Sequence, residues 1–360
     1  MTTHAAFRRR RLLIGLGAVI AVVAIVRLML PHWLTDTLNR RMAAMGDYRG
    51  QVADVDLSLY RGAYRIHGMR IEKRGGAVPE PLLAVPQLDL SIRWRELFAG
   101  ALVGEAVFHS PRVNFIDGRS ASEDQAGRGV DWRARLEELF PARLDRVVIH
   151  DGTVAFLNPF TTPAVELHAL DVEAVASNLT NVRDADGRRV ADVEAQARIL
   201  DDAPLELSAR FDPFGRFEDF SLDLRVQQVS LPRLNDLTRA YVGLDLSRGS
   251  GDLVLELDAA DGRLSGYAKP LLNDLEILDW EQDVERDRDN PLRLLWEGLG
   301  EALSELFSNQ PKDRFATRIP IEGRIDEPDT GALDAVIGIL RNAFVRAYEA
   351  HFEGGDGSSD

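Results

Sequence analysis

Apolar and polar residues alternate along most of the chain after residue 47. Such a period of two predicts strands with one apolar and one polar face. The apolar members of the clearest alternating segments are Leu88, Leu90, Ile92, Leu205, Leu207, Phe211, Phe220, Leu222, Leu224, Leu253, Leu255, Leu257, Ile319 and Ile321. Turn signals between the segments, such as Asp151-Gly152 and Asp261-Gly262, predict antiparallel hairpins, because a wet face is incompatible with a parallel sheet covered on both sides.

Helical spacing of apolar residues is confined to a few short segments. It predicts helices over 33–45, 130–140, 231–241, 290–307 and 330–348, with Gly46 ending the first and Pro141 stopping the second. The fold class is therefore mainly β, an antiparallel sheet with a few flanking helices. With so few helices, the apolar face must be buried by a second sheet, by curling of the sheet, or by a ligand.

The N-terminal segment has a different character. A cluster at Arg8, Arg9, Arg10 and Arg11 precedes an apolar run over 12–30, broken only by Arg27. As a helix this run is about 28 Å long, which matches one hydrocarbon core. Arg27 can extend to the interface, and Trp33 is typical of the headgroup level. A cleavable signal peptide is the alternative, but 30–33 offers no small-residue cleavage site.

These patterns divide the chain into six segments. They are a cytoplasmic basic segment (1–11), a transmembrane helix (12–30), a juxtamembrane helix (31–46), a β domain (47–330), a C-terminal amphipathic helix (331–352) and a disordered tail (353–360). The basic cluster places the N-terminus in the cytoplasm, so the rest of the chain is expected on the other side of the membrane, in the periplasm of a bacterium.

Composition removes several classes of function. The net charge of −15 argues against nucleic-acid binding, and the absence of cysteine excludes thiolate sites. Residues 1–30 carry a charge of +5 and the remainder −20, which agrees with the predicted orientation. No two of the seven histidines have metal-pair spacing in the sequence, and Gly249-Ser250-Gly251 is interpreted as a turn. We therefore expect no catalytic residues, no metal and no cofactor.

The order of several motifs resembles the AsmA-like superfamily, in the branch first catalogued as a domain of unknown function. The motifs lie at 86–115, 144–154, 241–257, 318–325 and 340–344. The resemblance implies a bacterial inner-membrane protein with a U-shaped periplasmic sheet. Its concave apolar face would hold lipid acyl chains and support phospholipid transport or outer-membrane homeostasis. The fourteen apolar residues named above are then candidate lipid contacts.

Two further expectations bound this interpretation. About 14 strands at 4.8 Å give a sheet of roughly 65 Å, which is too short to bridge two membranes alone. The alternative function is a structural or assembly factor of the envelope that acts through protein partners.

Overall fold

The computed structural model describes residues 29–43, 45–58, 63–75, 80–92, 103–120, 122–127, 130, 143–179, 191–212, 219–241, 244–280, 314–316 and 318–324. Several expected features lie outside these ranges: the basic cluster, Arg27, the helices over 290–307 and 331–352, and the tail. The expected span, apart from residues 29 and 30, and the expected helix over 130–140, apart from residue 130, also lie outside them. The described ranges contain no helix long and apolar enough to cross a membrane.

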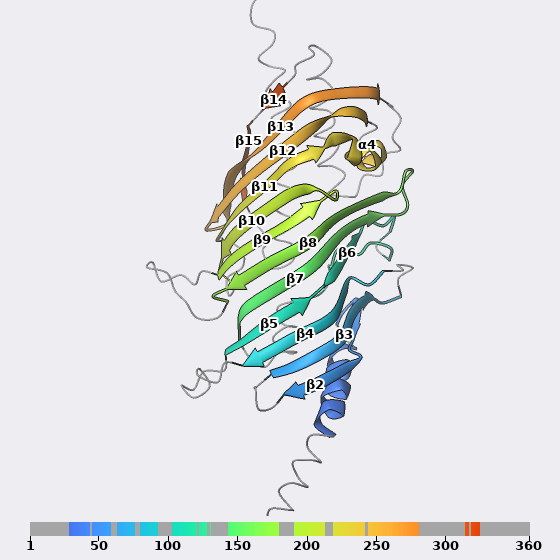
Figure 1. The fold of residues 1–360 in the computed structure, drawn as a ribbon, viewed down its shortest axis with the longest axis vertical. Helices are drawn as coiled ribbons and strands as arrows, with labels where there is room; N and C mark the ends of the chain where they lie inside the picture. Colours follow the sequence, from blue (N-terminus) through green and yellow to red (C-terminus); the bar gives the residue numbers. More distant parts are fainter. Residues whose placement is uncertain are drawn as a thin grey trace, which may run out of the picture.

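Within the described ranges, fifteen strands form one sheet (Figure 1), so the mainly β prediction is confirmed. The strands are β1 (Tyr48–Gln51), β2 (Asp54–Ser58), β3 (Ala63–Lys73), β4 (Leu83–Ile92), β5 (Val103–His109), β6 (Arg112–Ile116), β7 (Arg143–Asn158), β8 (Val165–Ser177), β9 (Ala191–Ile199), β10 (Ala203–Phe211), β11 (Phe220–Ser230), β12 (Leu244–Ala260), β13 (Arg263–Trp280), β14 (Arg314–Ala316) and β15 (Ile319–Arg324).

The sheet is mostly antiparallel, as the sequence predicts, and it departs from that pattern at one step. Strands β5 and β6 both pair with β4 in antiparallel orientation and with β7 in parallel orientation. A parallel pair needs a crossover in place of a hairpin, and here residues 117–142 connect β6 to β7. Alternation indicates which face a residue occupies but carries no information on strand direction, which is why the sequence missed this step.

The sheet is also shorter than expected. The strands β2, β6 and β15 lie beside the main path, which has twelve positions. Twelve positions at about 4.8 Å correspond to roughly 50–55 Å along the stack. The estimate of 65 Å treated every strand as a separate position, whereas β2, β6 and β15 share positions with other strands.

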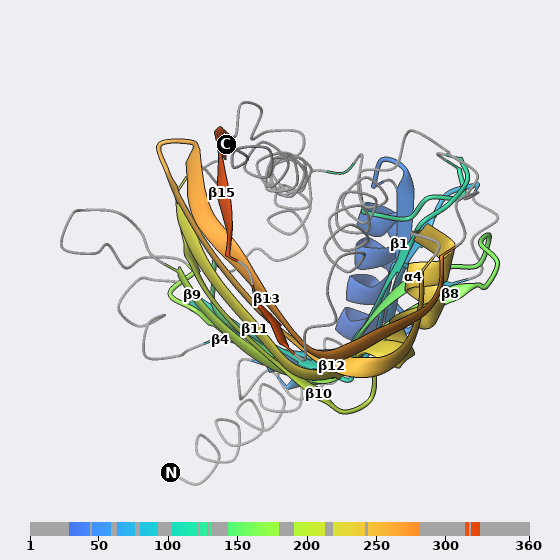
Figure 2. The ribbon, with the colours of Figure 1, turned by 90° about the horizontal axis from the view of Figure 1, so that it is seen from above.

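A line of β-bulges crosses the sheet and bends it into a U (Figure 2). Neighbouring strands place residues with positive φ at this line, which we call the bulge seam: Gly68, Ser110, Asp151, Asp171, Gln228, Gly249 and Asp274. The strand registers shift beside it in β7, β8, β11 and β12. Because a bulge inserts an unpaired residue and bends its strand, the seam accounts for the corner between the two arms of the U.

Carboxylates satisfy the backbone groups that the seam leaves without a strand partner. The N–H of Asp151 donates to Glu173 Oε1 at 2.8 Å, and the N–H of Gln228 donates to Asp252 Oδ1 at 2.7 Å. The turns predicted at Asp151-Gly152 and Gly249-Ser250-Gly251 are therefore bulges inside β7 and β12. Both structures need positive φ, so the same residue types serve either.

A helix over residues 29–42 packs against the first strands of the sheet. Leu34, Leu38 and Met42 contact the core that these strands form. Asn39 clamps the helix to the edge of the sheet, because its Oδ1 accepts from the Val52 N–H at 2.7 Å and its Nδ2 donates to the Val52 carbonyl at 3.1 Å. The helix expected over 31–46 thus forms over 29–42, and it belongs to the same core as the first strands.

A second helical segment fills a break in one arm of the U. The β9–β10 hairpin turns back at the seam and β11 ends at Ser230, where the 3-10 helix η2 (Leu231–Leu234) and α4 (Asn235–Tyr241) begin. Figure 1 shows α4 beside the ends of β8 and β12. Asn235 pairs with both backbone groups of Leu246, just as Asn39 pairs with Val52. The predicted helix over 231–241 is confirmed.

The Asn39 clamp gives a prediction on stability. Asn39→Ala leaves the N–H and carbonyl of Val52 without this partner, so we expect it to lower the free energy of unfolding by about 1–3 kcal/mol. Asp36→Ala, a change at an exposed position of the same helix, should change it by less than about 0.5 kcal/mol. Denaturant unfolding followed by circular dichroism measures both values, and equal values for the two variants would contradict the clamp.

Candidate functional site

The strand registers align apolar residues into two rows that cross the whole sheet. Residues paired directly across neighbouring strands lie on the same face, so each row can be followed from β2 to β15. One row is Val55, Ile66, Leu88, Phe108, Ile149, Ala174, Ala195, Leu207, Leu224, Leu255, Ala268 and Ile319; the other is Leu57, Tyr64, Leu90, Ala106, Val147, Ala176, Val193, Ala209, Leu222, Leu257, Gly266 and Ile321. No charged residue interrupts either row.

Thirteen of the fourteen residues singled out by alternation share this face. Nine stand in the two rows, and Leu205, Phe211, Phe220 and Leu253 are paired so that they lie on the same side. Ile92 pairs with Gly104, although its side chain is outside the described part of the structure. The register thus brings together residues that are up to 233 positions apart in the sequence.

The apolar face lies on the inside of the U. Leu34, Leu38 and Met42 of the first helix belong to one hydrophobic cluster with Val55 and Leu88 of the rows. Figure 2 shows that helix between the two arms, against the first strands. We therefore call this side of the sheet the inner face and the opposite side the outer face.

Coverage of the inner face differs between its ends and its middle. Leu88 near the first end and Ile321 at the last strand are both 0% exposed. In the middle, the row residues from β8 to β11 are half-buried, including Leu207, Leu222 and Leu224. Among the described residues, the hydrophobic clusters join Leu234 of η2 and Leu200 of the β9–β10 turn to this middle region, and Leu237 and Tyr241 of α4 pack against the start of β8.

The pKa of the Tyr64 hydroxyl indicates that the inner face has low polarity. Tyr64 lies on β3 in the second row, and burial raises the pKa of its hydroxyl to about 12. Burial disfavours the charged phenolate, which is the expected effect of an environment with little water.

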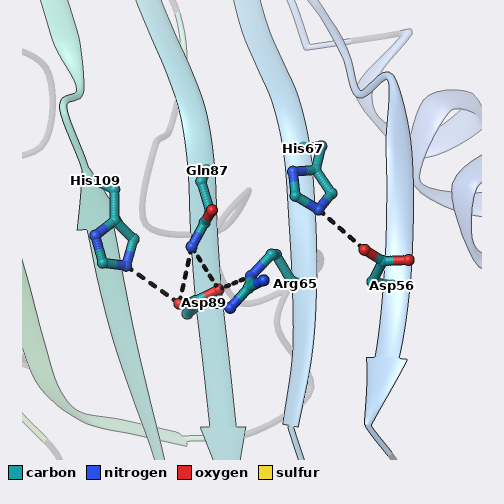
Figure 3. Close-up of polar contacts among 6 residues, drawn as sticks. All are labelled: Asp56, Arg65, His67, Gln87, Asp89 and His109. Carbon is teal, nitrogen blue, oxygen red and sulfur yellow. Dashed lines mark hydrogen bonds and ion pairs between the residues drawn. The ribbon is translucent and has the colours of Figure 1, made fainter.

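The outer face carries charged side chains that pair across strands (Figure 3). The Nε of Arg65 lies 2.6 Å from Asp89 Oδ1, and His109 Nε2 lies 3.1 Å from Asp89 Oδ2. Burial alone would raise the pKa of Asp89, but the hydrogen bonds from Arg65, His109 and Gln87 outweigh it and hold that pKa below its ordinary value. The charged and hydrogen-bonding side chains of these strands thus lie on the outer face.

Sequence reasoning missed the small residues of the inner face. The missed row positions on β8 and β9 are held by the small residues Ala174, Ala176 and Ala195. Two larger residues on β7, Val147 and Ile149, were also missed. In β9 the alternation of alanine with Glu194, Gln196 and Arg198 is a detectable signal, but alanine alone is a weak marker of an apolar face. In β8 the bulge at Asp171 breaks the period.

No protein-family model matches the chain, and no curated protein matches it. Within the described ranges, no group of three or more histidine or acidic residues is arranged to hold a metal ion. The chemistry of the inner face is therefore that of an extended apolar surface.

Tyr64 allows a test of the inner-face environment by pH. The ordinary pKa of tyrosine is about 10, so above pH 10 the unfolded chain releases this proton first. The free energy of unfolding should consequently fall by roughly 2–3 kcal/mol between pH 10 and 12. In Tyr64→Phe this part of the fall should be absent. Chemical unfolding at several pH values measures the slope, and an unchanged slope in Tyr64→Phe would show that Tyr64 does not titrate there.

Proposed function

We propose that the inner face binds the acyl chains of membrane lipids, and that the protein supports phospholipid transport or outer-membrane homeostasis from the bacterial inner membrane. The observation that carries this proposal is the pair of uninterrupted apolar rows across the sheet, which are half-buried in the middle. Hydrocarbon chains need a continuous apolar surface and no hydrogen-bond partners, and such a surface is what the rows offer.

The physical argument is the cost of leaving this surface in water. Burial of apolar area contributes about 25 cal/mol per Å², and soluble monomers rarely expose continuous apolar patches larger than a few hundred Å². A lipid chain on the middle of the inner face would lower this cost, whereas the two ends are already covered. In this proposal the interior of the U is the groove that holds the lipid.

The proposed membrane location rests on the sequence and on the first helix. The apolar run over 12–30 is the proposed single span, with the bulk of the chain in the periplasm. Met29 and Trp33 lie four residues apart on this helix, and their exposed fractions are 67% and 57%. This arrangement is typical of a helix end that lies in the membrane interface. With a sheet of roughly 50–55 Å, the protein would pass lipid to a partner.

Site-specific crosslinking in cells can distinguish lipid binding from the alternative role in envelope assembly. A photoreactive amino acid at position 207 faces the inner side, and the same residue at position 208 faces the outer side. We expect a lipid adduct at 207 and none at 208, detected by mass spectrometry of the purified full chain. A defined protein adduct at 207, or no adduct there, would count against lipid binding.

Charge substitutions on the inner face should have effects that depend on position. Leu207→Arg places a cation on the half-buried middle of the inner face, where we expect loss of bound lipid with a folded chain. Leu88→Arg buries the charge at a covered end, which should destabilise the fold by several kcal/mol. Ser208→Arg adds the same charge on the outer face and should change neither property. Circular dichroism and lipid extraction measure both, and unfolding by Leu207→Arg would indicate a closed core.

A further inference from the structure

Three histidines that are distant in sequence lie on one cross-strand row of the outer face. His67 on β3 pairs with Gln87 on β4, which pairs with His109 on β5, which pairs with His150 on β7. Each histidine has a carboxylate partner, and Figure 3 shows those of His67 and His109. The row depends on the parallel step between β5 and β7, which aligns His109 directly with His150.

His109 and His150 lie next to each other, and each has one ring nitrogen that its carboxylate contact leaves unused. Their rings are stacked, with centroids 6.0 Å apart and an interplanar angle of 30°. His109 uses Nε2 to contact Asp89 Oδ2 at 3.1 Å, and His150 uses Nδ1 to contact Glu173 Oε2 at 2.8 Å. Within the described part of the chain, the other nitrogen of each ring has no protein partner.

The carboxylates are held so that they orient the rings. Asp89 accepts from Arg65 and Gln87, and Glu173 accepts from the backbone N–H of Asp151 at the bulge seam. A carboxylate that accepts from one imidazole nitrogen leaves the other nitrogen free as a ligand, and this outer-shell arrangement is usual in histidine metal sites.

We propose that His109 and His150 together bind one divalent transition-metal ion of the class that imidazole favours, represented by Zn²⁺. An ion about 2.0–2.1 Å from an imidazole nitrogen lies in the plane of that ring. The two rings, with centroids 6.0 Å apart, therefore reach a shared ion by rotation about their side-chain torsions. The protein supplies two nitrogens, and water completes the coordination.

The surrounding charges favour a cation at this place. Asp89 and Glu173 flank the pair, and Arg65 and Arg146 are engaged by Asp89 and Glu105. His109 and His150 are 39% and 52% exposed at their side chains, so an ion can reach them from solvent. The site lies on the outer face and is independent of the lipid proposal.

Zinc titration of the full chain tests this site. Isothermal titration calorimetry should show saturable binding of one Zn²⁺, weakened at least tenfold in His109→Ala and in His150→Ala. His67→Ala is the matched control, because His67 also has a carboxylate partner but stands beside Gln87. Its removal should leave Zn²⁺ affinity unchanged.

The overturning results are equally specific. Absence of saturable Zn²⁺ binding, or equal affinity in wild type and both single variants, would show that the pair does not hold a metal. Circular dichroism verifies the fold of each variant, and His109→Gln, which keeps a polar side chain at the position, repeats the test if His109→Ala fails to fold.

Discussion

The structure depends on keeping one face of the sheet apolar through a bend. Side chains alternate between faces, so one inserted residue reverses the face of everything beyond it. In β7 the inner residues are Val147 and Ile149 before the seam and Val154 and Phe156 after it. The sequence period slips by one at Asp151, and the bulge absorbs the slip. Neighbouring strands do so along one line, and the inner face therefore remains apolar in both arms.

The two faces of the sheet contribute to the fold in different ways. Cross-strand ion pairs such as Arg65–Asp89, Arg198–Asp171 and Arg210–Asp192 lie on exposed surface and contribute little stability each. They do favour particular pairings between strands, because like charges opposite one another are unfavourable. The inner face in turn carries no charged residues along its rows. Register selection by polar pairs on one side thus permits a uniform apolar surface on the other.

Sequence reasoning predicted elements better than connections. Strict alternation in Leu205, Leu207 and Phe211 sufficed to predict β10 and its inner face. The dipeptide Asp-Gly is a hairpin turn at Asp261-Gly262 but a bulge at Asp151-Gly152, because positive φ is a local property and strand continuation is not. Sequence spacing could not predict the histidine pair, because His109 and His150 become neighbours only through the parallel pairing of β5 with β7.

The clamp between Asn39 and Val52 has a consequence for the pairing of further strands. An array of hairpins is a template to which further strands can add without limit. The amide of Asn39 occupies the backbone groups of Val52 at the first edge, and β15 near the other end contains Pro320, which has no N–H to offer. Both features reduce the number of backbone groups with which a further strand could pair at these positions.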